Sequence, residues 1–513
     1  MRNRKTLCRF FSALLFLALF LLAARFTDCD PAKFWERRGH LADLVIGMIP
    51  PDFSYLPRIL APLFSTVQMS VTGTAAGAFL ALLLAPFAAG NLDFSPFFRK
   101  LLRVLIQVLR SFPALILALA ATFVFGLGTF AGTAAIALYT FAIMTRLTYE
   151  DIETASTDSC EALGSMGVSP YPAYIHAMVP EIAPAFFANT LYLLETNVRH
   201  SSILGYVGAG GIGLLLNEKI SWLEYDKVGI ILLLLFLTVF LIESASRFLT
   251  SLILKERTIK KRTARTLIWI LTAFFLFCTL TTTPPDFSRT SPAALKNMIT
   301  GLFMPDLDFF FSSGKDGLGY LLLETVCISF VGTAIGAVIA VPLAFFNTRR
   351  FAPVPVCAFF NLFIMAVRSV PFFIYGLIFI RVSGPGPFTG VLTLAVCSIG
   401  LLTKRFTESL DSLDPGPYRA LISMGVSPVP AVCHGVLPQL KPAFFSAVLY
   451  RFDVNVREAS VLGLVGAGGI GAPLIFAMNQ YAWNKAGAIA LGLILLVWII
   501  DLLSSRLRRT IRG

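Results

Sequence analysis

The strongest constraint on how this chain can fold is a long internal repeat. The run 205–213 returns almost unchanged as 463–471, which lies 258 residues later. Between 161–213 and 419–471, 31 of 53 positions are identical without a gap. Identity at one fixed offset over such a length indicates a duplicated structural unit. The sequence therefore predicts two copies of one fold, joined in tandem as repeats 1–254 and 255–513.

The composition places both copies in a membrane. The chain is 56% hydrophobic and 14% charged, with a mean hydropathy of +0.77. A soluble domain carries about a quarter charged residues, so this chain cannot cover itself with polar surface. Six stretches in each half approach the ~20 apolar residues that a spanning helix needs. The expected segments are 8–25, 61–89, 101–125, 129–146, 183–210 and 228–250, then 266–282, 320–346, 357–382, 387–404, 441–468 and 485–504.

These segments predict an all-α integral membrane fold with about 12 transmembrane helices in two tandem, parallel six-helix repeats. The first segment could instead be a signal peptide, because basic residues precede the short apolar run 10–24. The repeat offset carries that run onto 268–282, inside the chain. An internal copy cannot be a cleaved signal, so we expect both runs to be retained helices. Pro113 and Pro371 should kink the third segment of each repeat.

The basic residues set the expected orientation. The net charge of +13 comes largely from short Lys/Arg blocks at 2–9, 99–103, 255–265, 349–350 and 506–512. Short loops rich in Lys and Arg stay on the cytoplasmic side. We therefore expect a multi-pass protein of the inner cell membrane with both termini in the cytoplasm. The lipid membrane explains the charge pattern, and no nucleic acid is needed as a partner.

A glycine-rich segment follows the fifth apolar segment of each repeat and contains a G-x-G-x-x-G pattern. A dinucleotide-binding turn would need a strand before it and an acidic residue about 20 positions later. Here a helix-like run precedes the glycines, and no acid follows Gly471 until Asp501. We expect instead a sharp break or a close helix approach within the bilayer. The glycines are Gly208, Gly210, Gly211, Gly213, Gly466, Gly468, Gly469 and Gly471.

A polar loop between the fourth and fifth segments, at about 150–182 and 408–440, carries the mechanism that we expect. Its pattern predicts a short helix, a glycine turn, a second short helix, and a proline that starts the next membrane segment. Small residues and the glycine leave room for another protein surface to approach. The residues alone do not separate such a docking surface from an ordinary connector.

The loop resembles the E-A-A…G…P signature of ABC importer permeases, which docks into a groove on the ATPase. Over nearly the whole of both halves, the chain is similar to phosphonate-type permeases, on the run LYxxxxNVR…xSxLGxVGAGGIG and on RSxP and DPGP. Such permeases mostly pair as dimers of half this length, so the chain resembles a tandem fusion. The resemblance implies ATPase-coupling roles for Glu161, Ala162, Gly167, Pro180, Ala420, Gly425 and Pro438. The second copy departs from the pattern by carrying Arg419 where the glutamate belongs.

Energy must come from a partner, because no G-x-x-x-x-G-K-[ST] phosphate-binding loop occurs in the chain. The resemblance implies two copies of a cytoplasmic ABC ATPase, which hold the ATP and Mg²⁺, and a solute-binding protein outside the membrane. The eight cysteines and four histidines show no metal-ligand spacing. We therefore expect no cofactor and no metal on this chain.

Ionisable residues inside membrane segments are candidates for function. Glu195 precedes Arg199 by four residues, and Asp453 precedes Arg457 in the same way, so each pair shares a helix face. One interpretation is a self-neutralised pair that fixes helix packing. The other is a translocation path whose arginines attract an oxyanion through their guanidinium forks. The path residues would be Glu195, Asn197, Arg199, Asp453, Asn455 and Arg457.

The sequence thus predicts a permease for phosphonate or a related phosphorus oxyanion, driven by ATP hydrolysis on separate subunits. Two alternatives stay open: a permease for another small solute such as methionine, and an ion-coupled secondary transporter with tandem repeats. A membrane enzyme has little support, because the two halves share no His/Asp/Glu cluster.

Overall fold

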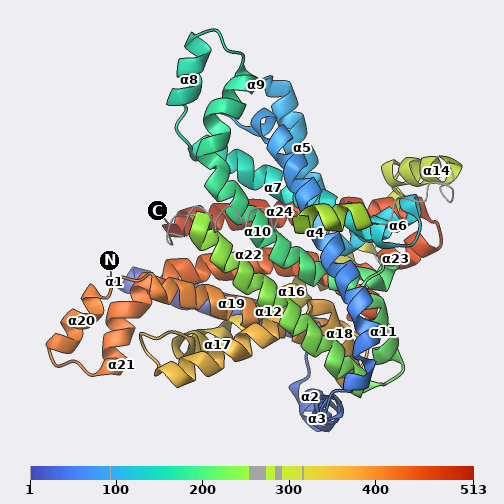
Figure 1. Ribbon diagram of the computed structural model, residues 1–513. Coiled ribbons are helices and arrows are strands. Elements are labelled where there is room, and N and C mark those ends of the chain that lie inside the picture. The colour runs from blue at the N-terminus through green and yellow to red at the C-terminus, as the bar shows by residue number, and fades with distance from the viewer. Residues whose placement is uncertain are drawn as a thin grey trace. The chain divides into compact units, whose positions relative to one another are not determined.

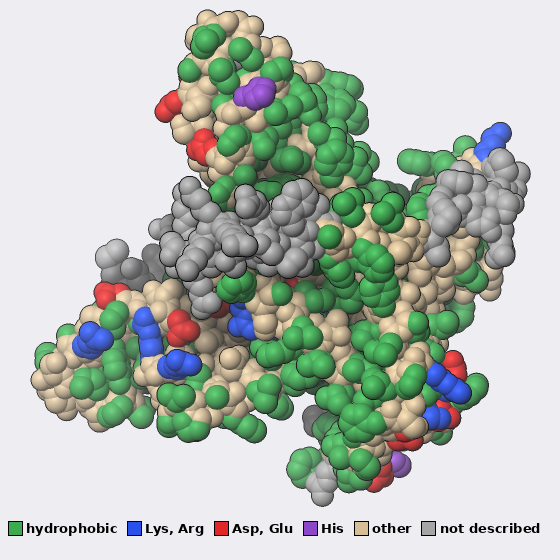
Figure 2. All heavy atoms as spheres, in the orientation of Figure 1, with side chains coloured by type: hydrophobic (Ala, Val, Ile, Leu, Met, Phe, Trp, Pro, Cys, Tyr) green, Lys and Arg blue, Asp and Glu red, His purple; other side chains and the backbone are tan. Residues whose placement is uncertain are grey.

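The computed structural model describes residues 2–92, 94–253, 273–282, 292–312, 314 and 317–512, and its regular elements there are all helices (Figure 1). Seven of the described helices are long and apolar enough to span a membrane, and two bent helix pairs raise the number to nine. This confirms the all-α membrane class. On the face drawn in Figure 2, hydrophobic side chains cover long stretches of the helices. The prediction for 266–272 lies outside the described residues.

Two compact units make up the chain, one formed by Ile46–Asn297 and the other by Met1–Val45 with Met298–Gly513. We call them the first and second compact units. Between residues 53 and 253 the first contains η1 (Phe53–Tyr55), α4 (Leu56–Ala88), α5 (Pro96–Ser111), α6 (Ala114–Phe125), α7 (Thr129–Thr154), α8 (Asp158–Ser165), α9 (Pro170–Ala173), η2 (Tyr174–Met178), α10 (Val179–Leu204), η3 (Gly205–Val207), α11 (Ile212–Ser221) and α12 (Tyr225–Ile253).

The second compact unit repeats this order after its own N-terminal elements. It contains α1 (Arg2–Phe26), α2 (Pro31–Glu36), most of α3 (Arg38–Gly47), the second half of α14 (Pro292–Phe303), α15 (Leu307–Phe310), α16 (Leu318–Asn347), α17 (Val354–Ser369), α18 (Phe372–Ser383), α19 (Pro387–Asp411), α20 (Gly416–Ser423), α21 (Pro428–Ala431), η5 (Val432–Val436), α22 (Leu437–Leu462), η6 (Gly463–Val465), α23 (Gly471–Asn479) and α24 (Trp483–Arg512).

The compact units and the sequence repeats divide the chain differently, because the first segment of each repeat packs on the other repeat's core. In the second compact unit, α1 lies along α16, with ring contacts from Phe16 to Phe330 (5.5 Å) and from Phe26 to Tyr320 (5.0 Å). In the first compact unit, the described residues 273–282 lie against α4. There the Gln68 amide donates to the Thr281 hydroxyl at 2.7 Å.

Helix pairs α4–α7 and α16–α19 form the centre of the two units, and a glycine pattern explains their close approach. Gly73 and Gly77 in α4, and Gly332 and Gly336 in α16, are spaced as G-x-x-x-G. A Cβ at Gly73 would lie 2.8 Å from the Thr133 carbonyl oxygen of α7, so a larger residue would push the helices apart. Small residues at this spacing let membrane helices pack backbone to backbone.

The third predicted segment of each repeat is not one continuous span, which corrects our expectation for 101–125 and 357–382. Helices α5 and α6 meet at 97°, and α17 and α18 meet at 87°. The residue before each proline is extended, with φ −91° and ψ 129° at Phe112 and φ −77° and ψ 121° at Val370. Proline disfavours helical backbone at the preceding residue and donates no backbone hydrogen bond, so the helix stops there. The predicted kink is confirmed, but it is a near right-angle break.

Candidate functional site

The polar loop of the first repeat folds as the expected helical hairpin. It leaves α7, forms α8, turns at Gly167 (φ +85°), and returns through α9 and the π-helical turn η2 into α10 (Figure 1). Pro180 lies in the first turn of α10. We call residues 155–182 the first coupling hairpin.

The second repeat builds the same hairpin from different residues. Here α20, Gly425 (φ +81°), α21 and the π-helical turn η5 lead into α22, and Pro438 lies in its first turn. We call residues 412–440 the second coupling hairpin. The predicted helix–turn–helix form is therefore confirmed in both repeats.

Every residue that the sequence singled out for coupling lies on the surface of its hairpin. The exposed residues are Glu161, Ala162, Gly167, Pro180, Ala420, Gly425 and Pro438, and Arg419 is exposed as well. A Cβ built at Gly167 or Gly425 would meet no atom within 4 Å. The hairpin turns therefore offer open surface, as a docking element requires.

Sequence reasoning missed two highly exposed apolar side chains on the hairpins. Met166 and Met424, each one residue before the turn glycine, are 79% and 71% exposed. Both occupy the same repeat position, and each is an unbranched side chain that can adapt to a partner's surface. The sequence did indicate them, because both repeats carry methionine at this position of an otherwise polar loop.

The first hairpin is anchored to its own unit by buried aromatic and polar contacts. The Tyr174 hydroxyl donates to the Leu82 carbonyl oxygen of α4 at 2.8 Å, and the Tyr171 ring stacks on Phe87 at 5.7 Å. Cys160 packs in the same cluster, and burial raises the pKa of its thiol. The second hairpin replaces these tyrosines with Val432 and Val429 and uses an edge contact between Tyr418 and Phe351 at 5.8 Å.

One asparagine joins three helices at the centre of each unit. The Asn197 amide donates to the hydroxyls of Thr74 (2.8 Å) in α4 and Thr140 (2.7 Å) in α7. In the second unit, the Asn455 amide donates to Thr333 (2.6 Å) and Ser398 (2.9 Å). Both asparagines are buried in the helix packing of their own unit, and their predicted place on the translocation path stays a prediction.

The predicted acid–base pairs on the fifth segment do form. Arg199 donates to Glu195 within α10, and Arg457 donates to Asp453 within α22, with all four side chains less than a fifth exposed. The structure therefore contains the self-neutralised pairs, while a role in solute passage stays a proposal. Sequence reasoning missed a third pair, in which Arg451 contacts Glu458 at 2.8 Å in the second unit only.

The glycine-rich segments end α10 and α22 and redirect the chain. Gly208 and Gly466 adopt left-handed backbone, with φ +82° and +75°, which glycine accepts without strain. The returning chain is held by side chains of the second segment. The Ile212 amide donates to the Thr66 hydroxyl at 2.8 Å, and the Ile470 amide donates to the Thr325 hydroxyl at 3.1 Å.

In the second unit, the Glu324 carboxylate also accepts from the Gly469 amide at 3.0 Å. The fifth expected segments, 183–210 and 441–468, therefore end as helices at Leu204 and Leu462. The break that we expected from the glycines lies at these points.

Comparison with known proteins settles the family. The family described as "Binding-protein-dependent transport system inner membrane component" matches residues 73–255 and again residues 332–512. The chain belongs to this family. Each match covers most of one sequence repeat, so this member carries the unit of the binding-protein-dependent permeases twice in one polypeptide.

Curated relatives support the same assignment. A phosphate-import permease protein PhnE from Mycolicibacterium smegmatis is 30% identical over 500 residues, covering 95% of this chain and 92% of the relative. A phosphite transport system permease protein PtxC from Stutzerimonas stutzeri is 36% identical over 189 residues, covering 37% of this chain and 69% of the relative. A solved structure of the MetNI methionine ABC transporter aligns with 43% of this chain and 99% of that chain, at 20% identity and a TM-score of 0.34.

Proposed function

We propose that this chain is the membrane permease of an ABC importer and carries phosphonate or a related phosphorus oxyanion into the cytoplasm. The observation that carries the proposal is the double family match, one per repeat, together with relatives named for phosphate and phosphite transport. The likeness to PhnE extends over 95% of the chain, so it includes both repeats.

The two coupling hairpins support a pair of ATPase subunits as the source of energy. Each hairpin presents an exposed methionine and an open glycine turn at equivalent positions, so each can seat one copy of a partner. ATP and Mg²⁺ would be bound by those copies, since the chain has no phosphate-binding loop of its own. In this arrangement the hairpins and both termini face the cytoplasm, and a solute-binding protein docks on the opposite face.

Arg199 and Arg457 are the side chains that we assign to the oxyanion. A guanidinium has five N–H donors, so pairing with one carboxylate does not use its full capacity. The Arg457 Nε has no hydrogen-bond partner among the described residues. A planar fork of donors matches the oxygens of a phosphorus oxyanion as well as those of a carboxylate, so the choice of a phosphorus oxyanion rests on the named relatives.

Uptake in cells that lack this chain tests the proposed function. We would compare methylphosphonate, phosphite, phosphate and methionine, with the intact chain restored as the control. The proposal predicts that uptake of at least one phosphorus oxyanion is lost and is recovered with the restored chain, while methionine uptake is unchanged. Loss of methionine uptake alone would overturn the choice of substrate.

A further inference from the structure

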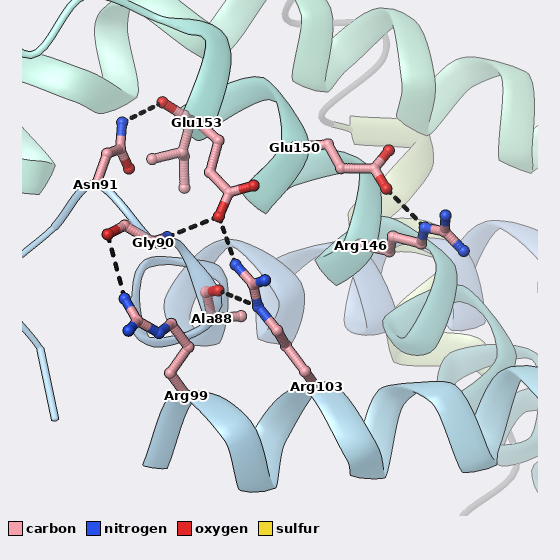
Figure 3. Close-up of polar contacts among 9 residues, drawn as sticks. Ala88, Gly90, Asn91, Arg99, Arg103, Arg146, Glu150 and Glu153 are labelled. Atoms are coloured by element: carbon pink, nitrogen blue, oxygen red, sulfur yellow. Dashed lines mark hydrogen bonds and ion pairs between the residues drawn. The ribbon is translucent and has the colours of Figure 1, made fainter. Parts of the chain in front are cut away.

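A polar lock joins three helices of the first compact unit directly beside the first coupling hairpin. Glu153 lies in the last turn of α7, five residues before α8 begins. Its Oε1 atom accepts from the Gly90 amide at 2.7 Å and from the guanidinium of Arg103 (Figure 3). One carboxylate thus ties the end of α7 to the chain after α4 and to α5.

Backbone atoms on both sides of this carboxylate are held by neighbouring side chains. The Arg103 Nε donates to the Ala88 carbonyl oxygen at 2.8 Å, and the Arg99 guanidinium donates to the Gly90 carbonyl oxygen at 3.1 Å. The Asn91 amide donates to the Ile152 carbonyl oxygen at 2.7 Å. Arg103 also lies over the Tyr149 ring, 4.8 Å from its centroid.

A side chain at position 90 would displace the Glu153 carboxylate from its present position. A Cβ built there would lie 2.9 Å from the Glu153 Oε1 atom, closer than real Cβ contacts occur. The glycine lets the backbone amide reach the carboxylate.

Contacts at both ends of the hairpin therefore connect it to α4 and to the chain that follows α4. Tyr174 is bonded to Leu82 on the return side, and Glu153 holds Gly90 on the entry side. A force on the hairpin reaches α4 through both, and reaches α5 through Arg103. Chains of hydrogen bonds and packed side chains between rigid elements are a physical means of transmitting such a displacement.

We propose that Glu153 and Arg103 are positioning residues that carry the movement of the first coupling hairpin into α4 and α5. This inference rests on the proposed function, because it assumes that an ATPase moves the hairpin. Neither residue touches the solute or the nucleotide. Their role is to make ATP hydrolysis productive for transport rather than to bind the ATPase.

In the second repeat, the corresponding connection has no ion pair among the residues that the structure describes. Asp411, at the repeat position of Glu153, accepts from the Thr348 hydroxyl at 2.5 Å. Arg350 donates to backbone carbonyl oxygens at the end of α19, including that of Leu413 at 2.6 Å. An uncharged acceptor can replace the Asp411 carboxylate in its bond to a neutral hydroxyl, whereas it weakens the Arg103–Glu153 contact, because hydrogen bonds between charged groups are stronger.

The test uses the full chain assembled with its ATPase and binding protein in lipid vesicles, and it measures solute transported per ATP hydrolysed. Glu153→Gln removes the charge, and Arg103→Gln is the second variant. Glu150→Gln is the matched control. Glu150 lies on the same helix, but its carboxylate pairs with Arg146 at 2.7 Å and takes no part in the lock (Figure 3). Asp411→Asn supplies the comparison in the second repeat.

We expect both lock variants to keep the ATPase bound and hydrolysing. The solute carried per ATP should fall by at least about fivefold, the lower end of typical coupling effects in proteins. Glu150→Gln and Asp411→Asn should keep the wild-type ratio. The charge reversal Arg103→Glu with Glu153→Arg should not recover the ratio, because an arginine at position 153 cannot accept from the Gly90 amide and a glutamate at position 103 cannot donate to the Ala88 carbonyl oxygen.

A wild-type ratio in Glu153→Gln and Arg103→Gln, or an equal fall in Glu150→Gln, would overturn the inference. A lock variant that no longer binds the ATPase would also overturn it, because the lock would then support docking. If the wild-type chain itself binds no ATPase, the proposed function fails instead, so the two failures are distinguishable.

Discussion

Arg451 and Glu458 form a two-bond ion pair inside the second compact unit, at positions where the first unit carries Leu193 and His200. The Arg451 Nη2 lies 2.8 Å from Glu458 Oε2, and the Nη1 lies 3.3 Å from Oε1. Arg451 is 3% exposed, and its Nε donates to Ser398, which also accepts from Asn455. The two repeats thus share a fold but stabilise its centre differently.

Breaking this pair from one side should be costly. Arg451→Leu leaves the Glu458 carboxylate in a mostly buried position without its partner, which typically destabilises a protein by about 3–5 kcal/mol. The double variant Arg451→Leu with Glu458→His copies the first unit and should recover most of that loss. Thermal unfolding of the purified chain in detergent measures both. Additive losses in the double variant would show that the pair does not stabilise the unit.

Asn197 should matter for stability and not for passage of solute. Asn197→Ala removes hydrogen bonds to two other helices, and bonds of this kind between membrane helices contribute about 0.6–2 kcal/mol. Thr190→Ala is the control on the same helix, because the Thr190 hydroxyl bonds only within α10, to the Phe186 carbonyl oxygen. We expect a lower melting temperature for Asn197→Ala and near wild-type uptake per folded molecule. Lost uptake at unchanged stability would return Asn197 to the path.

Arg199 and Arg457, in contrast to Asn197, should be needed for uptake of the solute. Replacing Arg199 and Arg457 together with Gln should abolish oxyanion uptake, because the amide keeps some hydrogen bonding but removes both positive charges. Association with the ATPase should be unchanged, since neither residue lies on a coupling hairpin. Uptake and ATPase co-purification are measured on the same preparation. Unchanged uptake would leave the pairs with a packing role only.

Substitutions at the two hairpin glycines can distinguish a direct contact with the ATPase from an effect of backbone strain. Gly167→Asp with Gly425→Asp adds a side chain into open space at a left-handed position, where Asp is tolerated better than Ala. If the turns contact the ATPase, the Asp pair should prevent stimulation of ATP hydrolysis and stop transport. Gly167→Ala with Gly425→Ala should have the smaller effect, although its backbone is more strained. The reverse order would mean that turn conformation, not contact, is what matters.

Much of this architecture follows from the sequence because the repeat doubles each observation. Features that depend on residues close together in the sequence were predicted correctly. They are the hairpin turns at Gly167 and Gly425, the break before Pro113, and the Glu195–Arg199 pair. The exposed methionines were also visible as repeated apolar residues in a polar loop.

What the sequence could not supply depends on contacts between distant segments. The apolar run of α1 carries no information on its partner, so its packing on α16 could not be read from it. Arg451 and Glu458 are seven residues apart and occur in one repeat only, so a search for features shared by both repeats does not find them. The Arg103–Glu153 contact joins residues 50 positions apart on two helices, and only the fold brings them together.

The most direct test of the central claim is energy-dependent uptake in reconstituted vesicles. Vesicles that hold this chain with its ATPase and binding protein should accumulate a phosphorus oxyanion when ATP and Mg²⁺ are supplied. Vesicles that hold this chain alone should not accumulate it on a proton or sodium gradient. Accumulation by the chain alone, on an ion gradient and without nucleotide, would contradict the account.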